Sequence, residues 1–382
     1  MIYQVNKYFC QKSYVTKHFL KCMHHCIDPQ RSILYPLKSK RLLLVTGNEA
    51  SVFLQGLITN DMRHFEEGAK SVYAMFLNNK GRVLFDTLIH KWGNDQSYML
   101  ECDQKIVSSL EKHLKVFKLR RKVTIENIHS DHYKLWALIT PKDKSIDENI
   151  DLKGEVNIYK DPRLSELGHR IISAINITES QVINSLCNNV TVDNNEDGYR
   201  YFRYKLGVSE GADDLPPGTS FPLEVNCDYL HGVSFHKGCY IGQEVTARVH
   251  HTGVVRKRIM SLKFAESVKE KIENDSIITA SSNPKSNLGK LKGVADNYGL
   301  GLIRIKEALD VKSLKIGNYI AEAVKPDWWP IEAPKELQKN KWRLLKKKLM
   351  NLYTMTSHAV AVISKRKFII KELNHHFHVI YN

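Results

Sequence analysis

The chain has 382 residues, of which 42% are apolar and 26% are charged, so its composition is that of two or three folded domains. No apolar run approaches the roughly 18–20 residues that a spanning helix needs, which argues against a helical membrane protein. Its seven cysteines are odd in number and widely spaced, which excludes a disulfide framework and is typical of a reducing compartment.

The net charge of +16 is concentrated at the two ends of the chain. Residues 1–41 carry a net charge of +7 and residues 331–382 a net charge of +8, whereas residues 42–330 carry only +1. A nucleic-acid binder needs its basic excess on the folded body, where it can face phosphates. We therefore expect no nucleic-acid partner, and an RNA-associated protein that binds through its tail is the weakest of three functional hypotheses.

Residues 1–37 predict a mitochondrial transit peptide, and hence a protein of the mitochondrial matrix. Basic residues alternate with apolar and aromatic ones, and Asp28 is the single acid, which is the pattern of a basic amphipathic import helix. Lysines stand where such peptides more often have Arg and Ser, so an ordinary N-terminal extension is the alternative. Cys10, Cys22 and Cys26 are set aside as site residues because cleavage would remove them.

The chain after this segment predicts a body of mixed strands and helices. Apolar and β-branched runs at 41–47 and 71–78 predict strands, and a turn at 79–81 predicts a hairpin with the strand that follows. Apolar residues at helical spacing predict helices over 48–57 and 103–119. Because strands and helices do not alternate strictly, we expect the α+β class.

A loop-rich break precedes a β-rich C-terminal part. Gly, Pro and Asp crowd residues 209–222, which is loop composition. Beyond Gly253, short apolar runs separated by glycines predict the strands of a small sandwich or barrel, at 254–265, 276–280, 289–305 and 318–324. In the tail, residues 340–353 have an amphipathic pattern that suits an acidic membrane surface, although a solvated basic helix is the simpler interpretation.

The most specific chemistry lies in residues 237–244, KGCYIGQE. Cys239 stands between two glycines, two residues after Lys237, and a helix is expected to begin at Gln243. A nearby ammonium and a helix N-terminus both favour the thiolate, which is the form that binds metal or attacks an electrophile. On composition alone, a small buried cysteine at a tight turn is the commoner case.

This segment, with TARVHHTG after it, resembles the signature of the YgfZ-like proteins, relatives of the aminomethyltransferase of glycine cleavage. Further matches are FLQGLITND (53–61), FLNNKGRVLFDTLI (76–89), FKLRRKV (117–123), PLEVN (222–226) and KPDWWP (325–330). Together they cover about 42–330, and with the predicted transit peptide the chain is similar to the mitochondrial branch of that family. The resemblance implies a folate-binding α+β body around a central channel (38–244) and a small β-barrel (245–330). It does not extend into residues 331–382, which we interpret from their composition as a basic extension of uncertain order.

The resemblance also implies a function: an assembly factor for late maturation of 4Fe–4S proteins, working with A-type iron–sulfur carrier proteins and without catalytic turnover. The corresponding aminomethyltransferase segment lacks the thiol of Cys239, so its presence here favours cluster handling. We expect Lys237 to help ionise this thiol, and Gln243 and Glu244 to position the loop.

An iron–sulfur cluster takes about four thiolates, commonly in closely spaced runs. The cysteines of the body, at positions 102, 187, 227 and 239, have no such spacing, and their convergence in space is the less favoured alternative. We therefore expect Cys239 to be a redox thiol or one ligand of a cluster shared transiently with a partner, and Cys227 to be a buried loop residue. The nearby histidines lack the spacing of zinc sites, so zinc is a minor alternative.

The runner-up function is a tetrahydrofolate-dependent one-carbon transferase. Asp86 and Glu224 stand where the aminomethyltransferases are expected to have acidic residues, and a carboxylate can accept hydrogen bonds from a pterin. The folate contacts that the resemblance implies also include Arg203 and Asn60. The simpler interpretations are a turn residue at a strand end for Asp86 and a salt bridge to the region of Arg200 and Arg203 for Glu224.

Overall fold

The computed structural model describes residues 31–93, 96–128, 131–141, 155–186 and 190–330. Residues 1–30 of the predicted transit peptide, Cys187 and the amphipathic segment at 340–353 lie outside the described residues. The end of the predicted peptide is part of the fold, because Ser32–Pro36 form a paired strand and Leu37 is buried. The predicted boundary at residue 37 therefore lies too far along the chain. Within those residues, no helix combines the length and the apolar character needed to cross a membrane.

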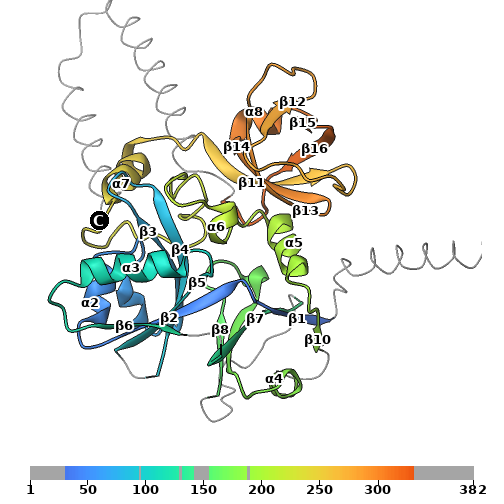
Figure 1. The fold of residues 1–382 in the computed structure, drawn as a ribbon. Coiled ribbons are helices and arrows are strands. Elements are labelled where there is room, and N and C mark those ends of the chain that lie inside the picture. Colours follow the sequence, from blue (N-terminus) through green and yellow to red (C-terminus); the bar gives the residue numbers. More distant parts are fainter. Residues whose placement is uncertain (1–30, 94–95, 129–130, 142–154, 187–189, 331–382) are drawn as a thin grey trace, which may run out of the picture. The chain divides into compact units, whose positions relative to one another are not determined.

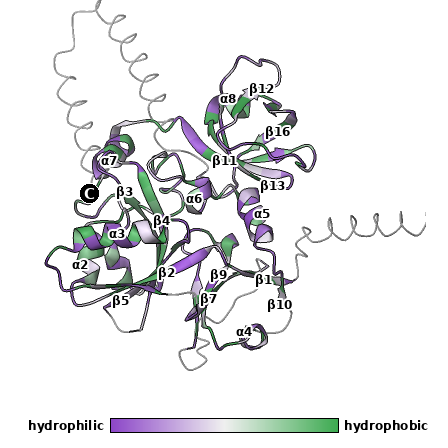
Figure 2. Cartoon of the chain, viewed as in Figure 1, coloured by the Kyte–Doolittle hydropathy of each residue, from purple (hydrophilic) through white to green (hydrophobic). Residues whose placement is uncertain are grey.

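The first five-stranded sheet has the order β3-β4-β5-β2-β6, and all of its pairs are antiparallel (Figure 1). Its strands are β2 (Lys40–Thr46), β3 (Ser71–Leu77), β4 (Val83–Lys91), β5 (Ser97–Asp103) and β6 (Thr124–Ile128). Helices α2 (Ala50–Gln55) and α3 (Val107–Lys118) bury Phe53, Leu54 and Leu110 against it. Figure 2 shows the hydrophobic colour along β3 and β4 and both hydrophobic and hydrophilic colours on α3, as expected for an amphipathic helix packed on a sheet.

The second five-stranded sheet has the order β10-β1-β7-β9-β8. Its strands are β1 (Ser32–Pro36), β7 (Tyr133–Ile139), β8 (Val156–Lys160), β9 (His169–Ala174) and β10 (Val190–Val192). Helix α4 (Glu179–Ser185) begins with a capping box at Thr178 and packs Val182 into the core formed with Trp136.

The C-terminal strands close into a six-stranded barrel in the order β11-β14-β13-β12-β15-β16, and β16 pairs back with β11. Its strands are β11 (Lys257–Phe264), β12 (Ile277–Ala280), β13 (Gly289–Ala295), β14 (Tyr298–Arg304), β15 (Leu314–Ile316) and β16 (Tyr319–Val324). A short helix, α8 (Ile305–Asp310), follows β14. Closure pairs the sheet edges that a flat arrangement would expose.

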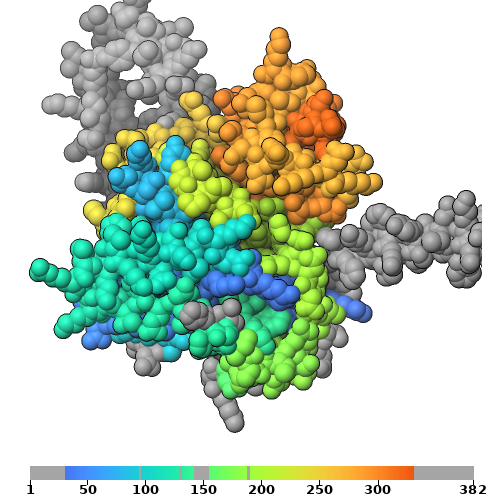
Figure 3. Space-filling view, viewed as in Figure 1, coloured from blue at the N-terminus to red at the C-terminus, as the bar shows by residue number. Residues whose placement is uncertain are grey.

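Helix α5 (Glu196–Leu206) links the second sheet to the barrel, because it contacts β1 and the barrel strands β11, β13 and β14. Helix α6 (Gly211–Asp214) follows it and contacts β4, β5 and β13. In the space-filling view the yellow-green segment that holds α6 lies against the orange barrel (Figure 3). Helix α7 (Gln243–Thr252) precedes the barrel, and 3₁₀ turns occur at η1 (Met62–Phe65) and η2 (Ser165–Leu167).

The α+β class is confirmed, and so is a C-terminal barrel. The predicted run at 289–305 is a hairpin of two strands, since β13 and β14 meet at 296–297. The predicted loop at 209–222 contains the short helix α6, whose backbone is tied to buried carboxylates of the first sheet. Position 245, where the sequence suggests the barrel begins, falls inside α7.

Candidate functional site

The thiol of Cys239 is exposed, on a loop that runs from His236 into α7. The loop is fixed by its main chain: Ile241 N–H donates to the carbonyl of Gly56 at 3.2 Å, just after α2. Tyr240 N–H donates to Oε1 of Gln243 at 3.3 Å, so this side chain holds the turn before its own helix. The loop therefore has a defined backbone although its cysteine faces solvent.

Lys237 is the buried anchor of this loop. Its ammonium donates to the carbonyls of Gln55 at 2.7 Å, Ile58 at 2.8 Å and Asn60 at 2.6 Å. These carbonyls lie at and just beyond the end of α2, where a helix leaves acceptors without intrahelical partners. A cation at a helix C-terminus is electrostatically favoured as well. Burial nevertheless lowers the pKa of Lys237 to about 8, and the negative charge of Asp61 opposes that shift.

The predicted role of Lys237 in ionising Cys239 gains no support from these contacts. Its three N–H donors point to three carbonyls, and within the described residues no hydrogen bond joins it to Cys239. The structural role of this lysine is to tie the loop to the end of α2. The loop also contains Tyr240, whose ring centroid lies 5.0 Å from the ammonium.

Gly242 allows the loop to lie directly on the turn between β3 and β4. It has φ +78°, and a Cβ at this position would lie 2.3 Å from the carbonyl oxygen of Asn78 and 2.7 Å from Cβ of Leu77. Only glycine fits both the backbone conformation and this close approach. By contrast, a Cβ on Gly238 would meet no atom within 4 Å. The loop is thus tightly packed on one side of Cys239 and open on the other.

The three described cysteines differ sharply in access. Cys102 and Cys227 are buried, and burial raises the pKa of both thiols. Cys227 packs beside Gly232, as expected for a structural loop residue. Cys239 alone of these three reaches solvent, and the described residues contain no group of three His, Cys, Asp or Glu side chains placed to hold a metal ion.

The remaining polar residues near the loop have local partners. Glu244 is highly exposed, and its Oε1 lies 3.5 Å from Nη1 of Arg248 one helical turn later. His250 stacks on Phe235, with ring centroids 3.4 Å apart, and lies edge-on to His251. Gln243 thus contacts the main chain of the loop, whereas the side chain of Glu244 is exposed on the helix.

A second polar region, here called the buried ionic centre, consists of Lys40, Asp86, Glu101, Asp161, Arg163, Arg170 and Glu210. Glu210 is its hub, with oxygens 2.7 Å from Lys40, 2.7 Å from Arg163 and 2.9 Å from Arg170. Arg170 also contacts Glu101 at 3.0 Å, which joins β9 of the second sheet to β5 of the first. Burial alone would raise the pKa of Glu101, but Arg170 and His90 hold it at about 2.

Asp86 lies within β4, so the strand-end interpretation is wrong. Both of its oxygens accept the N–H of Gly211, at 3.2 and 3.1 Å, and burial raises its pKa while Lys40 opposes the rise. Near it, the hydroxyl of Tyr73 is buried and has no hydrogen-bond partner among the described residues. Tyr73 lines a cavity of about 530 Å³ together with Asn60, a volume in the range of small-molecule sites.

The other residues expected to contact folate are engaged by the protein. Both N–H groups of the Asn60 amide donate, to the carbonyls of Tyr73 at 2.7 Å and His231 at 2.8 Å. Arg203 pairs with Asp214 at 2.9 Å. Glu224 accepts from Phe221 N–H at 3.4 Å, and its suggested salt bridge to Arg203 is not formed. The fit to folate therefore depends on the cavity, on the unpartnered hydroxyl of Tyr73 and on Asp86, which is buried near that tyrosine but does not line the cavity.

Sequence reasoning missed the buried ionic centre. Its members Glu101 and Arg170 interrupt apolar strand runs, in YMLECD and HRIIS, and a charge inside a buried strand is the signal that marks such a residue. Their pairing is not readable from one sequence, because the two residues are 69 positions apart.

Two family models match the chain. One is described as the GCVT N-terminal domain and matches residues 29–151, and the other as the CAF17 C-terminal beta-barrel domain and matches residues 256–331. Among solved structures, the glycine cleavage system aminomethyltransferase T from Bartonella henselae has a TM-score of 0.61 and 15% identity, over 79% of this chain and 87% of that one. This likeness concerns the fold, and it confirms the predicted aminomethyltransferase-like architecture.

Curated relatives are similar over most of the chain. The iron–sulfur cluster assembly factor IBA57, mitochondrial, of Mus musculus is 34% identical over 319 residues, which is 78% of this chain and 86% of the relative. The Homo sapiens protein of the same name is 34% identical over 317 residues, covering 78% and 85%. A homologue from Mycosarcoma maydis is 39% identical over 233 residues, covering 58% and 54%.

Proposed function

The chain belongs to the family of mitochondrial iron–sulfur cluster assembly factors named IBA57, and from this premise we propose that Cys239 is its working group in cluster assembly. The family confirms the resemblance that the sequence suggests, and the relatives' names confirm a mitochondrial location. We place the activity in the matrix, after removal of a targeting segment that ends before β1 (Ser32–Pro36). The role is assembly of 4Fe–4S proteins at a late stage, and it needs no catalytic turnover.

The observation that carries this proposal is the exposed thiol on a fixed backbone. A cluster needs about four ligands, and Cys239 is the one described cysteine that reaches solvent. A single ligand from this chain calls for a partner that contributes the others. We propose an A-type iron–sulfur carrier in that position, with the cluster as shared cargo and Cys239 as a transient ligand or redox thiol.

The test is complementation of cells that lack the protein, read out as the activity of 4Fe–4S enzymes such as aconitase. Cys239→Ser should fold normally and fail to restore activity, because the hydroxyl is a poor ligand and a poor nucleophile at neutral pH. Cys227→Ser is the matched control, since its buried thiol has no proposed part in ligation. Normal aconitase activity with Cys239→Ser would reject the proposal.

The same assay separates the runner-up function. A tetrahydrofolate-dependent one-carbon transferase would depend on Asp86 and tolerate Cys239→Ser. Our proposal requires the opposite: Cys239→Ser should abolish complementation, and a substitution at Asp86 should have the smaller effect. In purified protein mixed with a carrier and an iron–sulfur source, a visible absorption band of a shared cluster should appear with the wild type and be lost with Cys239→Ser.

Binding of tetrahydrofolate is a separate proposal. The carboxylate of Asp86 would accept hydrogen bonds from the pterin N–H groups, and the hydroxyl of Tyr73 would supply the donor that is otherwise unused. When bound, the group supplies an acceptor for one-carbon units. Equilibrium dialysis with tetrahydrofolate should show saturable binding that Asp86→Asn weakens at least about tenfold, which corresponds to roughly 1.4 kcal/mol. Equal retention by both proteins would reject a folate contact at Asp86.

A further inference from the structure

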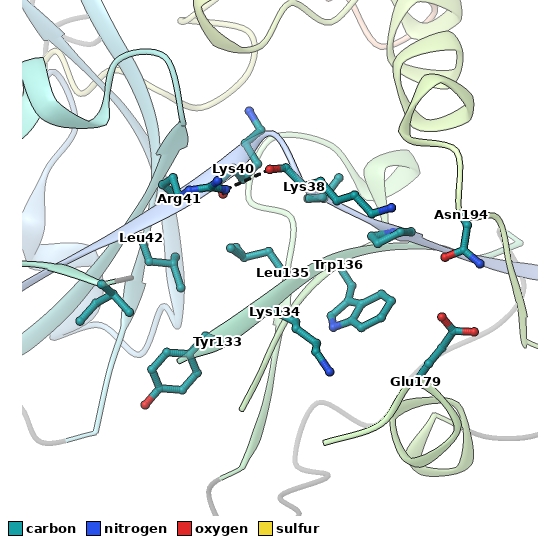
Figure 4. A pocket seen from close by; sticks show the side chains of 13 residues that line it. Lys38, Lys40, Arg41, Leu42, Tyr133, Lys134, Leu135, Trp136, Glu179 and Asn194 are labelled. Atoms are coloured by element: carbon teal, nitrogen blue, oxygen red, sulfur yellow. Dashed lines mark hydrogen bonds between the residues drawn. The ribbon is translucent and has the colours of Figure 1, made fainter. Parts of the chain in front are cut away.

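A cavity of about 470 Å³ lies where the second sheet loses a strand (Figure 4). The last register pair between β1 and β7 joins Pro36 to Trp136, yet β7 starts three residues earlier, at Tyr133. Beyond Leu37 the chain turns away into β2, so the position beside Tyr133 and Lys134 that a longer β1 would occupy is open. The cavity is therefore a consequence of sheet topology.

The wall of this cavity is apolar and rigid. Leu37, Leu42, Leu135 and Trp136 are all buried side chains that line it. The Trp136 indole is held in place because its Nε1–H donates to Oγ of Ser173 at 3.1 Å. Tyr133 closes the side nearest Leu42, and its ring is fixed edge-on to Trp92 at 5.3 Å. Such a wall favours a flat or chain-like apolar group.

The rim of the cavity carries an unbalanced positive charge. It is lined by Lys38, Arg41 and Lys134. The hydrogen-bond partners of Arg41 and Lys134 are main-chain carbonyls. Arg41 donates to the carbonyls of Lys38 at 3.0 Å and Lys40 at 2.7 Å, and Lys134 to that of Ile177 at 2.9 Å. Carbonyl acceptors hold these groups in place without neutralising them. In the described part of the chain, none of the three forms an ion pair with a carboxylate.

The lining offers little to offset that charge. Its fourth cation, Lys40, is already paired with Glu210 at 2.7 Å. Glu179 is the single acidic residue of the lining. An uncharged apolar ligand would leave the rim cations without a counter-charge, and a polyanion would gain nothing from the apolar wall. The complement of this site is one negative charge on an apolar body.

We propose that this cavity binds a small apolar monocarboxylate, with its hydrocarbon or aryl body against Trp136 and Leu135 and its carboxylate at the rim between Lys38 and Arg41. The proposal does not rest on the cluster-assembly role. It assigns this chain a second binding site, for a metabolite of acyl or aryl acid type.

The experiment measures binding of 1-anilinonaphthalene-8-sulfonate, an apolar fluorescent monoanion, to the full chain. We expect saturable binding of the probe at one site and its displacement by decanoate. Decanol has the same hydrocarbon chain without the charge, so displacement by decanol should need at least a tenfold higher concentration. The double variant Lys38→Ala/Arg41→Ala should bind the probe about tenfold more weakly and lose the preference for decanoate. Lys285→Ala/Lys290→Ala, which removes two exposed charges from the barrel, is the matched control and should bind as the wild type does.

Thermal unfolding of each variant shows whether its fold is retained, and an unchanged midpoint assigns the loss of binding to the rim. A second variant, Tyr133→Ser, should weaken the binding of decanoate and of decanol to the same extent, because it removes part of the apolar wall and leaves the cations of the rim in place. No saturable binding by the wild type, equal displacement by decanoate and decanol, or equal affinity in the two double variants would each overturn the proposal.

Discussion

The Cys239 loop and the buried ionic centre use their polar groups in opposite ways. In the loop, main-chain and lysine contacts fix the backbone, so the side chain of Cys239 is left free. In the ionic centre, side chains pair with one another, and Glu210 alone contacts three cations. Charged side chains that pair with one another are not available to bind a partner or a ligand. The comparison favours the loop for the proposed partner-directed chemistry, whereas Glu210 and its three cations stabilise the fold.

The largest expected effect tests the structural side of this comparison. Arg170→Met should lower the free energy of unfolding by about 3–5 kcal/mol, because it leaves buried Glu101 and Glu210 with fewer counter-charges. Urea denaturation measures the loss. Arg200→Met is the control: its surface pair with Asp197 should be worth less than about 1 kcal/mol. Similar losses in both variants would show that burial does not govern the centre.

The next effect tests how firmly the loop is held. Gly242→Ala should cost about 2–4 kcal/mol, because its positive φ and its contacts with Asn78 and Leu77 leave no room for a methyl group. Gly238→Ala, four residues earlier and in open space, should change stability by less than about 0.5 kcal/mol. The measurement is urea denaturation of both variants. If both substitutions were tolerated equally, the loop would not be seated on the β3–β4 turn.

The smallest effect is a pH dependence that originates at Lys237. Its pKa is about 8 in the folded chain and 10.5 when exposed, so between these values the unfolded state binds more protons. The contribution of this residue to the free energy of unfolding therefore rises with pH over that window and is constant on either side of it. Lys237→Met should remove the rise, seen as a smaller difference between denaturation at about pH 7.5 and at about pH 9.5.

Lys263→Met, at an exposed lysine of the barrel, is the control for that measurement. It should keep the pH dependence of the wild type. A Lys237→Met protein with an unchanged slope would mean that the ammonium is not buried as the structure has it.

Sequence patterns predicted the features that depend on neighbours in the chain. The strands β2 and β3, the hairpin turn before β4 and the start of α7 at Gln243 follow from local periodicity and glycine placement. The pairing of β1 with β7 and β10 did not follow, because those partners are about 100 and 160 residues apart. Strand β15 has only three residues, too few for a periodic signal.

In the candidate site, too, the features that depend on neighbouring residues were predictable and the long-range contacts were not. The segment that holds Cys239 is recognisable from its own eight residues, whereas the function of Lys237 is not. Its acceptors are main-chain carbonyl groups, which any residue type provides, and they lie at and just beyond the end of α2, 177 to 182 positions earlier in the chain. Reasoning from adjacent residues therefore paired the ammonium with the nearby thiol rather than with that helix.

The bonds from Lys237 to the end of α2 span 177 to 182 residues of sequence. During synthesis, α2 emerges long before its cation does, and contacts of such separation form late in folding. A chain truncated before this lysine, or one whose halves have not yet met, lacks the support that presents the sulfur. The backbone that presents Cys239 is therefore complete only after these two distant parts of the chain have met.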